Sequence, residues 1–136
     1  MTEETTKKTT HVQSVGRRKS ASARSRITKG KGEITVNSKP FVEYFPYFEL
    51  QEIVLSPLVA VGAEKKYNFS LKIVGGGPKG QAGAAKHAIA RNLIKLDEDY
   101  RKVLRAGGFL TRDSRVKERK KPGKRGARRG QQWKKR

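Results

Sequence analysis

The sequence predicts one small domain built from both strands and helices, followed by a long basic tail. Residues 33–37 and 67–73 alternate between apolar and polar side chains, as strands do. Residues 82–96 instead repeat apolar side chains at the spacing of a helix. Beyond Leu110 the chain offers almost nothing apolar until Trp133, so the tail has no core of its own around which to fold.

The overall charge points to a polyanionic partner. The chain of 136 residues carries 33 Lys and Arg against 12 Asp and Glu, a formal net charge of +21. Such an imbalance favours nucleic acid first and an acidic membrane second. Cysteine is absent, which excludes disulfides, thiolate zinc sites and a cysteine nucleophile. The apolar stretch 53–63 is too short to span a bilayer and residues 1–10 lack the features of a signal peptide, so we expect a soluble cytoplasmic protein with no membrane partner.

The positive charge is concentrated at two places in the chain. Residues 112–136 contain 13 Lys and Arg but only two acids, and a second basic block covers residues 17–31. Residues 33–64 show the opposite balance, with five Glu against Lys39. Scattered surface lysines would not produce this pattern, so the two basic segments are the candidate binding regions.

The first half of the chain predicts two strands and one or two helices. Residues 1–10 have almost nothing to bury and are predicted to be disordered. Weak alternation over residues 11–27 and the clearer strand 33–37 flank a turn at residues 30–32, so we expect these strands to pair as a hairpin. A helix should start near Phe48 and stop before Pro57, where Ser-Pro can begin another helix.

The second half predicts a strand and two helices. Residues 67–73 form the clearest strand, with Tyr, Phe, Leu and Ile on one face and Asn, Ser and Lys on the other. After a glycine-rich turn, the helix over 82–96 places His87, Arg91 and Lys95 opposite its apolar side. The acids 97–99 begin a short helix that ends at two glycines, 107 and 108.

Gly75, Gly77 and Gly80 satisfy a GxGxxG pattern between a strand and a helix. A dinucleotide site would also need an acid at the end of a second strand, whereas the acids 97–99 here cap a second helix. No Gly-Lys-Ser or Gly-Lys-Thr follows, which excludes a P-loop. Two interpretations remain: the glycines only allow a tight turn, or the helix start, with Lys79 beside it, also binds an RNA phosphate.

Neither histidine predicts chemistry. His87 is more simply a surface residue of its helix, and His11 lies near the terminus, so we predict neither a catalytic dyad nor a metal site. We therefore predict no enzyme activity, no metal and no cofactor. The tail is rich in arginine, which forms bidentate hydrogen bonds with phosphates and stacks on bases. Its glycines make the tail flexible enough to follow a folded RNA. Nucleic-acid binding is favoured over a solubilising role for this segment.

Several motifs, in order, resemble the small-subunit ribosomal protein nine family over about residues 11–136. The similarity begins with GRRKS at 16–20, continues with the glycine-rich and alanine-rich segment 75–84, and includes TRD at 111–113. The chain ends in Lys135 and Arg136, as the bacterial and organellar members of the family do. Ordered motifs of this kind are far more specific than one glycine pattern.

The resemblance implies a two-layer α+β domain with a mostly four-stranded sheet and helices on one face, plus a long extended basic C-terminal tail. It divides the chain into a disordered extension at 1–10, an rRNA-binding domain at 11–109 and the tail at 110–136. It also implies a structural, non-enzymatic place in the head of the small ribosomal subunit. The expected partners are small-subunit rRNA, neighbouring ribosomal proteins of the head and the P-site tRNA.

The basic segments and the resemblance together give the candidate site residues. Those expected to bind rRNA are Arg17, Arg18, Lys19, Arg24, Arg26, Lys79, Gly80, Gln81, His87, Arg91, Arg112, Arg115, Arg119, Lys120, Lys121, Arg125, Arg128 and Arg129. Those expected to contact P-site tRNA are Lys134, Lys135 and Arg136. Two other hypotheses are a dinucleotide-dependent enzyme, based on the glycine pattern, and a cationic DNA-packaging protein, based on net charge alone.

Overall fold

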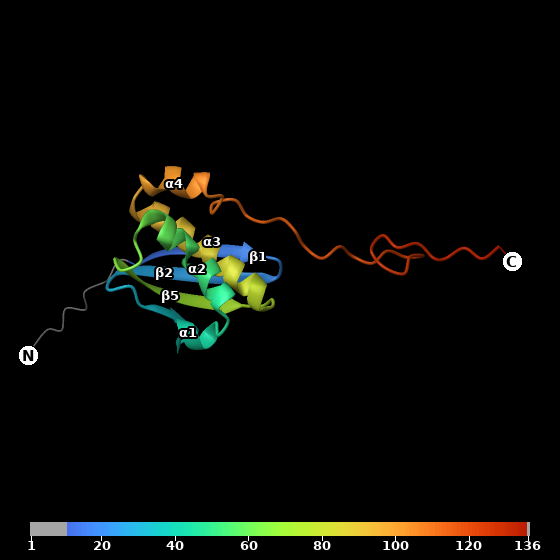
Figure 1. Ribbon diagram of the computed structural model, residues 1–136, viewed down its shortest axis with the longest axis horizontal. Coiled ribbons are helices and arrows are strands. Elements are labelled where there is room, and N and C mark those ends of the chain that lie inside the picture. The colour runs from blue at the N-terminus through green and yellow to red at the C-terminus, as the bar shows by residue number, and fades with distance from the viewer. Residues whose placement is uncertain (1–10, 136) are drawn as a thin grey trace, which may run out of the picture.

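A mixed sheet and four helices make up the domain in the computed structural model, which describes residues 11–135 (Figure 1). Their bounds are β1 Val12–Arg18, β2 Ala21–Lys29, β3 Ile34–Val36, β4 Lys39–Pro40, α1 Phe41–Tyr44, α2 Phe48–Val61, β5 Tyr67–Val74, α3 Pro78–Leu96 and α4 Tyr100–Ala106. This composition confirms a small α+β domain.

The sheet has five strands in the order β1-β2-β5-β3-β4, rather than the four that were expected. The additional strand is β4, which is only two residues long and pairs antiparallel with β3 across the turn at Asn37 and Ser38. Both turn residues have positive φ, +48° and +67°, as tight hairpin turns of this kind require. The extra strand therefore follows from a short turn that periodicity could not reveal.

The predicted pairing of residues 11–27 with residues 33–37 is wrong. Strand β2 has β1 on one side and β5 on the other, both antiparallel, so no edge of β2 is free for β3. Strand β3 pairs instead with β5, in parallel, because α1 and α2 carry the chain back before β5 begins. The real hairpin joins β1 to β2 through Lys19, whose φ of +53° lies in the left-handed region.

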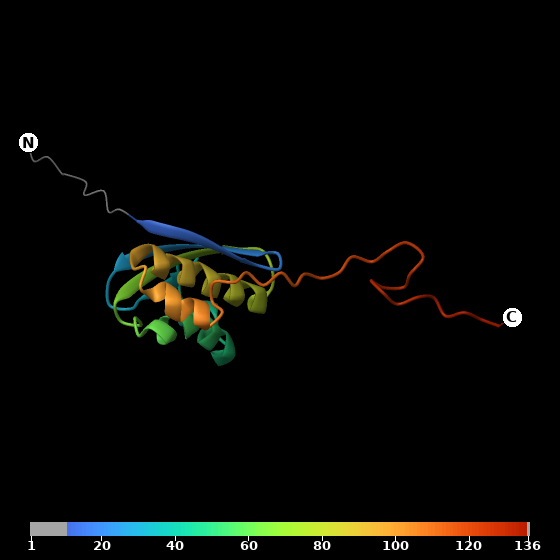
Figure 2. The ribbon, with the colours of Figure 1, turned by 90° about the horizontal axis from the view of Figure 1, so that it is seen from above.

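The helices lie on one face of the sheet, as Figure 2 shows. The expected alternation in β5 is confirmed: Phe69, Leu71 and Ile73 are buried against the helices, and Ser70 and Lys72 are exposed on the other face. Strand β2 alternates in the same way, with its odd-numbered positions from 21 to 27 buried. The sheet thus has a covered face and an open face.

Helix α3 lies against β1 and β2 at unusually close range because its inner side is made of small residues. Its buried positions include two glycines and five alanines. Opposite them, a Cβ atom at Gly16 of β1 would lie 2.2 Å from the Ala84 carbonyl oxygen and 2.3 Å from the Ala88 nitrogen. The side-chain amide of Asn92 also donates to the carbonyl of Ser25, 2.9 Å away, and so ties α3 to β2. Backbone-to-backbone contact sets the spacing between the two layers.

Helix α2 does not stop before Pro57 but continues to Val61, so the predicted break is wrong. The Ser56 hydroxyl donates to the Ile53 carbonyl at 2.7 Å, and Pro57 is buried in the core. Burial of the apolar side of α2 outweighs the hydrogen bond that proline removes. The helix ends at Gly62, which has a φ of +67°.

The glycine-rich turn between β5 and α3 is shaped by contact with the β1–β2 turn. Gly75 and Gly76 have φ values of +74° and +69°, and Cβ atoms there would come within 2.8 Å of Ser20 and Ala21. In the described residues no strand follows α3, which leaves the dinucleotide fold without its second half. The tight-turn interpretation of these glycines is therefore sufficient for Gly75 and Gly76.

Beyond the domain, the described chain continues as a C-terminal segment. The expectation of disorder in residues 1–10 lies outside the described residues. Residues 111–135 contain no helix or strand and lead away from the domain in both views (Figures 1 and 2). Among the described residues, none of the helices combines the length and the apolar character that crossing a membrane requires.

Gly16→Ala should destabilise the domain because the new methyl group meets main-chain atoms of α3 that cannot move away alone. We expect a loss of about 1–3 kcal/mol in the free energy of unfolding, measured by urea denaturation of the free protein. Gly80→Ala is the matched control, since its Cβ would meet nothing closer than 3.7 Å and alanine favours a helix. Equal stability of the two variants would contradict this account of the packing.

Candidate nucleic-acid interface

Every charged residue in the five strands is basic. Alternation sends Arg24 and Arg26 of β2 and Lys72 of β5 to the open face of the sheet. Arg17 of β1 pairs with Ser22 of β2 and so lies on the same face. We call these four cations and the sheet surface between them the open face.

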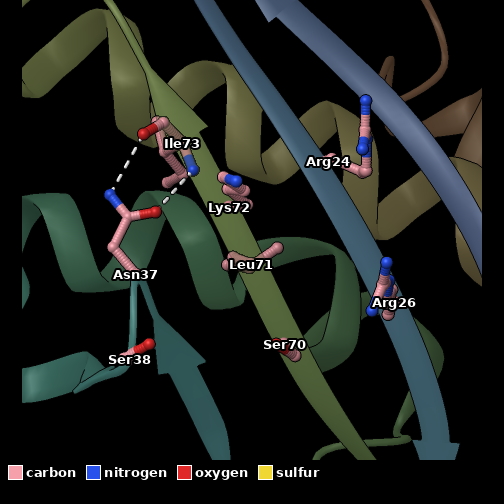
Figure 3. A pocket seen from close by; sticks show the side chains of 8 residues that line it. All are labelled: Arg24, Arg26, Asn37, Ser38, Ser70, Leu71, Lys72 and Ile73. Carbon is pink, nitrogen blue, oxygen red and sulfur yellow. Dashed lines mark hydrogen bonds between the residues drawn. The ribbon is translucent and has the colours of Figure 1, made fainter.

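Cations on the open face are direct neighbours. Arg24 lies opposite Lys72 in the β2–β5 ladder, a like-charge pair that costs free energy when no anion is present. Beside it is a hollow of about 590 Å³, lined by residues from β2, β5 and the β3–β4 turn, and Figure 3 shows its side chains. The lining residues are Arg24, Arg26, Asn37, Ser38, Ser70, Leu71, Lys72 and Ile73. This shape and charge suit a phosphate backbone.

A chain of hydrogen bonds links the rim of this hollow to the glycine-rich turn. Asn37 pairs with the backbone of Ile73 in both directions, accepting at 2.9 Å and donating at 3.0 Å, as the dashed lines in Figure 3 show. Asn37 also donates to the Tyr44 hydroxyl at 3.4 Å. Tyr44 in turn donates to Gln81 at 2.9 Å, and Gln81 donates to the Gly75 carbonyl at 3.0 Å. The side chain of Gln81 therefore holds the turn, and its role in rRNA binding stays a prediction.

The start of α3 carries three residues predicted to bind rRNA, Lys79, Gly80 and Gln81, and they differ in exposure. Lys79 is exposed, while Gly80 is buried among the residues of the β1–β2 turn. Gly77 caps the helix in an extended conformation, and no atom would crowd a Cβ at that position. Space for a close approach thus exists at Gly77, beside Lys79 and the unpaired N–H groups of the first turn.

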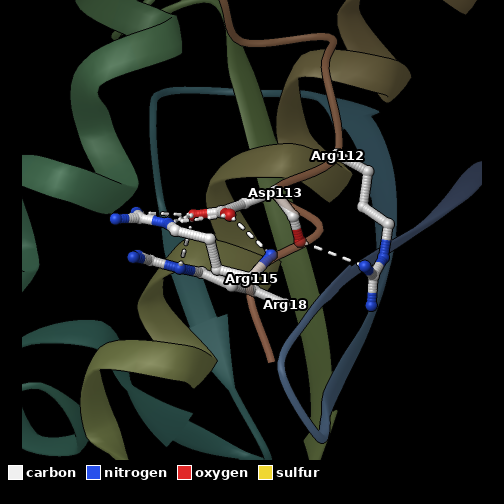
Figure 4. A network of polar contacts seen from close by, with 4 residues as sticks. All are labelled: Arg18, Arg112, Asp113 and Arg115. Atoms are coloured by element: carbon white, nitrogen blue, oxygen red, sulfur yellow. Dashed lines mark hydrogen bonds and ion pairs between the residues drawn. The ribbon is translucent and has the colours of Figure 1, made fainter. Parts of the chain in front are cut away.

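A second basic cluster forms where the tail leaves the domain; we call it the tail junction. Arg18 points to the covered face of β1 and crosses α3 at Gly83, where a Cβ would lie 2.2 Å from its Cδ. Its Nε lies 3.6 Å from the Asp113 carboxylate, which Arg115 also binds, at 2.7 Å (Figure 4). Arg112 donates to the Asp113 carbonyl at 3.0 Å. One carboxylate thus gathers cations from both ends of the chain.

Electrostatics at the junction favour a charged Asp113. Hydrogen bonds from the side chain and backbone of Arg115, with the charges of Arg115 and Arg18, hold the pKa of Asp113 far below its usual range. The carboxylate therefore stays ionised across the physiological pH range and remains a partner for these cations. Arg18 and Arg115 contact this one carboxylate, and Arg112 lies nearby at the Asp113 main-chain carbonyl, so the junction keeps an excess of positive charge for an anion.

His87 contacts the beginning of the tail from α3. Its Nε2–H donates to the carbonyl oxygen of Leu110 at 3.2 Å, because a carbonyl can only accept. Its Nδ1 is buried without a hydrogen-bond partner. Burial lowers the pKa of His87, and the nearby charges of Arg91, Arg112 and Lys86 lower it further, against a smaller raising effect of the Leu110 hydrogen bond. His87 is accordingly a neutral donor that docks the tail.

Arg91 extends from α3 to the backbone of β1. Its guanidinium donates to the Val15 carbonyl at 2.5 Å, and Lys95 donates to the Gln13 carbonyl at 2.6 Å. Both bonds cover carbonyl groups on the free edge of β1, which would otherwise be open to another strand. Arg91 therefore has an evident structural role, and its contact with rRNA stays a prediction.

The remaining tail cations are exposed and largely without internal partners in the described chain, apart from one cluster. Glu118 forms ion pairs with Lys121 and with Arg128, the latter at 3.0 Å. The predicted tail residues that are exposed and form no ion pair within the described chain are Arg119, Lys120, Arg125, Arg129, Lys134 and Lys135. Arg136 lies outside the described residues.

The structure also adds two cations that the sequence-based list omitted. Lys72 belongs to the open face, and the alternation of β5 could have assigned it there. Lys86 lies with its ammonium 5.8 Å from the centre of the Phe109 ring, at the junction. No group of three or more His, Cys, Asp or Glu residues able to hold a metal ion occurs among residues 11–135.

Comparison with known proteins gives consistent matches. The profile of the family described as Ribosomal protein S9/S16 matches residues 16–136. The chain is 54% identical over 121 residues to the small ribosomal subunit protein uS9 of Mesoplasma florum, covering 89% of this chain and 92% of that protein. It is 52% identical over 121 residues to the uS9 protein of Borrelia turicatae, covering 89% of both.

His87 makes stability depend on pH in a defined direction. Its pKa in the folded protein lies below the ordinary value of 6.5, so the unfolded chain binds a proton first as the pH falls. The free energy of unfolding, measured by urea denaturation, should therefore decrease as the pH falls from about 7 through the ordinary histidine pKa of 6.5. His87→Gln keeps a donor for Leu110 without the titration, and an equal decrease in that variant would exclude His87 as the cause.

Proposed function

The chain belongs to the Ribosomal protein S9/S16 family, and from this membership we propose that it binds small-subunit rRNA through the open face, the tail junction and the basic tail. The family consists of structural, non-enzymatic components of the ribosome, so the predicted lack of enzyme activity is confirmed and the dinucleotide hypothesis is wrong. The DNA-packaging hypothesis rested on net charge alone and has no further support. The proposed location is the cytoplasm, within the small ribosomal subunit.

The observation that carries this proposal is the sorting of charge by the sheet. All acids of the domain lie in loops and helices, while the open face presents Arg17, Arg24, Arg26 and Lys72 with no acid between them. The like-charge neighbours Arg24 and Lys72 become favourable once a phosphate lies between them. Release of counterions from the RNA would supply much of the affinity.

The tail junction supports a second contact with RNA and gives the tail a fixed starting point. Arg18 and His87 of the domain meet Asp113 and Leu110 of the tail, so residues 110–113 are held against α3. From there the remainder of the proposed tail (residues 110–136) follows the rRNA away from the domain, beginning at residue 114. Its arginines and glycines suit a segment that adapts to a folded RNA.

The tip of the tail is the proposed contact with the P-site tRNA. Lys134 and Lys135 are exposed, and the sequence adds the guanidinium group of Arg136, which can bind a phosphate through two hydrogen bonds. Trp133 is 82% exposed, which leaves its ring free to stack on a base or a sugar. Extended chain spans up to about 3.3–3.6 Å per residue, so the tip can reach far beyond a small domain.

Removing two cations from the open face should weaken rRNA binding and reduce its dependence on salt. For Arg24→Ala with Arg26→Ala, the slope of log K against log salt should flatten by roughly 1.5 units, if both side chains neutralise phosphates. Filter binding to a small-subunit rRNA transcript measures this slope. Lys65→Ala with Lys66→Ala removes the same charge from an exposed loop after α2, and an equal effect there would leave no special role for the open face.

Deleting residues 133–136 should leave subunit assembly near normal while weakening P-site tRNA binding. The expected loss is no more than about 1–3 kcal/mol, the value of one good stack or bidentate contact. Filter binding of tRNA to purified wild-type and truncated subunits measures it. Unchanged tRNA affinity together with a reduced yield of subunits would assign the tip to rRNA instead.

A further inference from the structure

The outer side of α2 is apolar although nothing in the domain covers it. Phe48 and Val59 are 70% and 58% exposed, and they lie eleven residues apart, about three helical turns, so both face the same way. Leu55 lies between them and is only partly covered. The inner side of the same helix already supplies Leu50, Val54 and Leu58 to the core. A helix apolar on both sides is normally buried on both.

This surface continues into a groove at the start of the helix. The groove has a volume of about 590 Å³ and is lined by Tyr47, Phe48, Glu49, Leu50, Pro78 and Lys79. Tyr47 is 68% exposed, so two neighbouring aromatic rings stand at the surface. We call the groove and the outer side of α2 the α2 face. Exposed aromatic side chains in a recess are typical anchors of protein interfaces.

The charge of the α2 face favours a basic protein over RNA as its occupant. Glu49 lines the groove and Glu52 follows Phe48 by one turn on the outer side, and both are exposed. Glu43 precedes them on α1, whereas α2 itself contains no Lys or Arg. In a chain of net charge +21 this is a local reversal of sign. A phosphate backbone would be repelled, while a basic partner would be attracted.

The α2 face lies apart from the open face and from the tail junction, and it meets a predicted RNA-binding residue only at Lys79. Figure 2 places the helices, α2 among them, on one side of the sheet, and the open face is the other side. The tail junction is built on α3 and β1, not on α2. Lys79, the basic residue in the groove, stands at the start of α3 and marks the limit of the acidic surface. The molecule therefore offers two sides of opposite chemistry.

We propose that the α2 face docks a basic protein of the ribosomal subunit, which inserts an apolar side chain into the groove beside Phe48 and sets lysines or arginines against Glu49 and Glu52. The apolar anchor supplies the affinity, and the acids select a basic partner and orient it. This inference rests on the family membership of the chain and not on the proposed RNA contacts. The test separates this partner from two alternative occupants. One is a second copy of this chain, which would bind through its basic tail, and the other is RNA.

Photo-crosslinking identifies the occupant directly. Phe48 is replaced by a photo-crosslinking phenylalanine analogue in the full chain, which is assembled into small subunits, irradiated and analysed by mass spectrometry. The expected product joins position 48 to a lysine-rich or arginine-rich segment of another ribosomal protein. The same analogue at Val74, which is 63% exposed on the open face, should join the protein to rRNA. Failure at Val74 alone would count against the proposed RNA contact and leave the α2 face unaffected.

Competition between variants tests the chemistry of the contact. Wild-type and variant chains are mixed in equal amounts during subunit reconstitution, and their ratio in the product is measured. Tyr47→Ser with Phe48→Ser should reduce incorporation about tenfold. Val103→Ser, which removes an exposed apolar residue from α4, is the control and should leave the ratio unchanged. A helical signal by circular dichroism equal to that of the wild type excludes misfolding.

Charge reversal gives opposite results for the two kinds of occupant. Glu49→Lys should lower incorporation against a basic protein, whereas it would raise incorporation if RNA lay there. Glu64→Lys makes the same change at an exposed position outside the groove and should have little effect. The proposal is overturned by a crosslink from position 48 to RNA, to a second copy or to an acidic segment, by the absence of any crosslink, or by equal incorporation of the variants.

Discussion

The close packing of β1 on α3 is the constraint on which the other features depend. Because Gly16 has no side chain and α3 turns alanines and glycines inward, the strand and the helix meet backbone to backbone. This short distance allows Arg91 and Lys95 to reach carbonyl groups on the outer edge of β1. It also leaves Gly83 as the gap across which Arg18 reaches Asp113. A wider separation would remove the tail junction along with the protected edge.

The pleat of the strands directs neighbouring basic side chains to different surfaces of the domain. In the run Arg17, Arg18, Lys19 the pleat sends the first residue to the open face and the second under α3, and the turn exposes the third. One basic motif thus contributes to two sites and a loop. The acids are absent from all five strands, and three of them, Glu43, Glu49 and Glu52, lie on α1 and α2. The result is a domain whose open face suits phosphates and whose α2 face suits a basic protein.

The glycine-rich turn shows how a motif can have a structural explanation and still neighbour a binding site. Gly75 and Gly76 need their left-handed conformations, and Gln81 closes the turn by bonding to the Gly75 carbonyl. Gly75, Gly76 and Gln81 therefore have structural roles in the turn. Gly77 and Lys79 are not crowded and remain accessible at the helix start. A phosphate at this place would therefore meet two residues of the motif rather than all of it.

The sequence by itself determined the composition of the elements and the kind of partner. Alternation in β5, the helical period of α3, and the basic tail are local properties, and the ordered motifs identified the family. Strand order was decided only by the tertiary structure, because β2 pairs on both edges with strands whose positions no local pattern encodes. Burial in the core likewise kept α2 helical through Pro57, and the roles of Arg18, Gln81 and Lys72 depend on distant neighbours. Local spacing determines which way a side chain points, whereas packing determines what it meets.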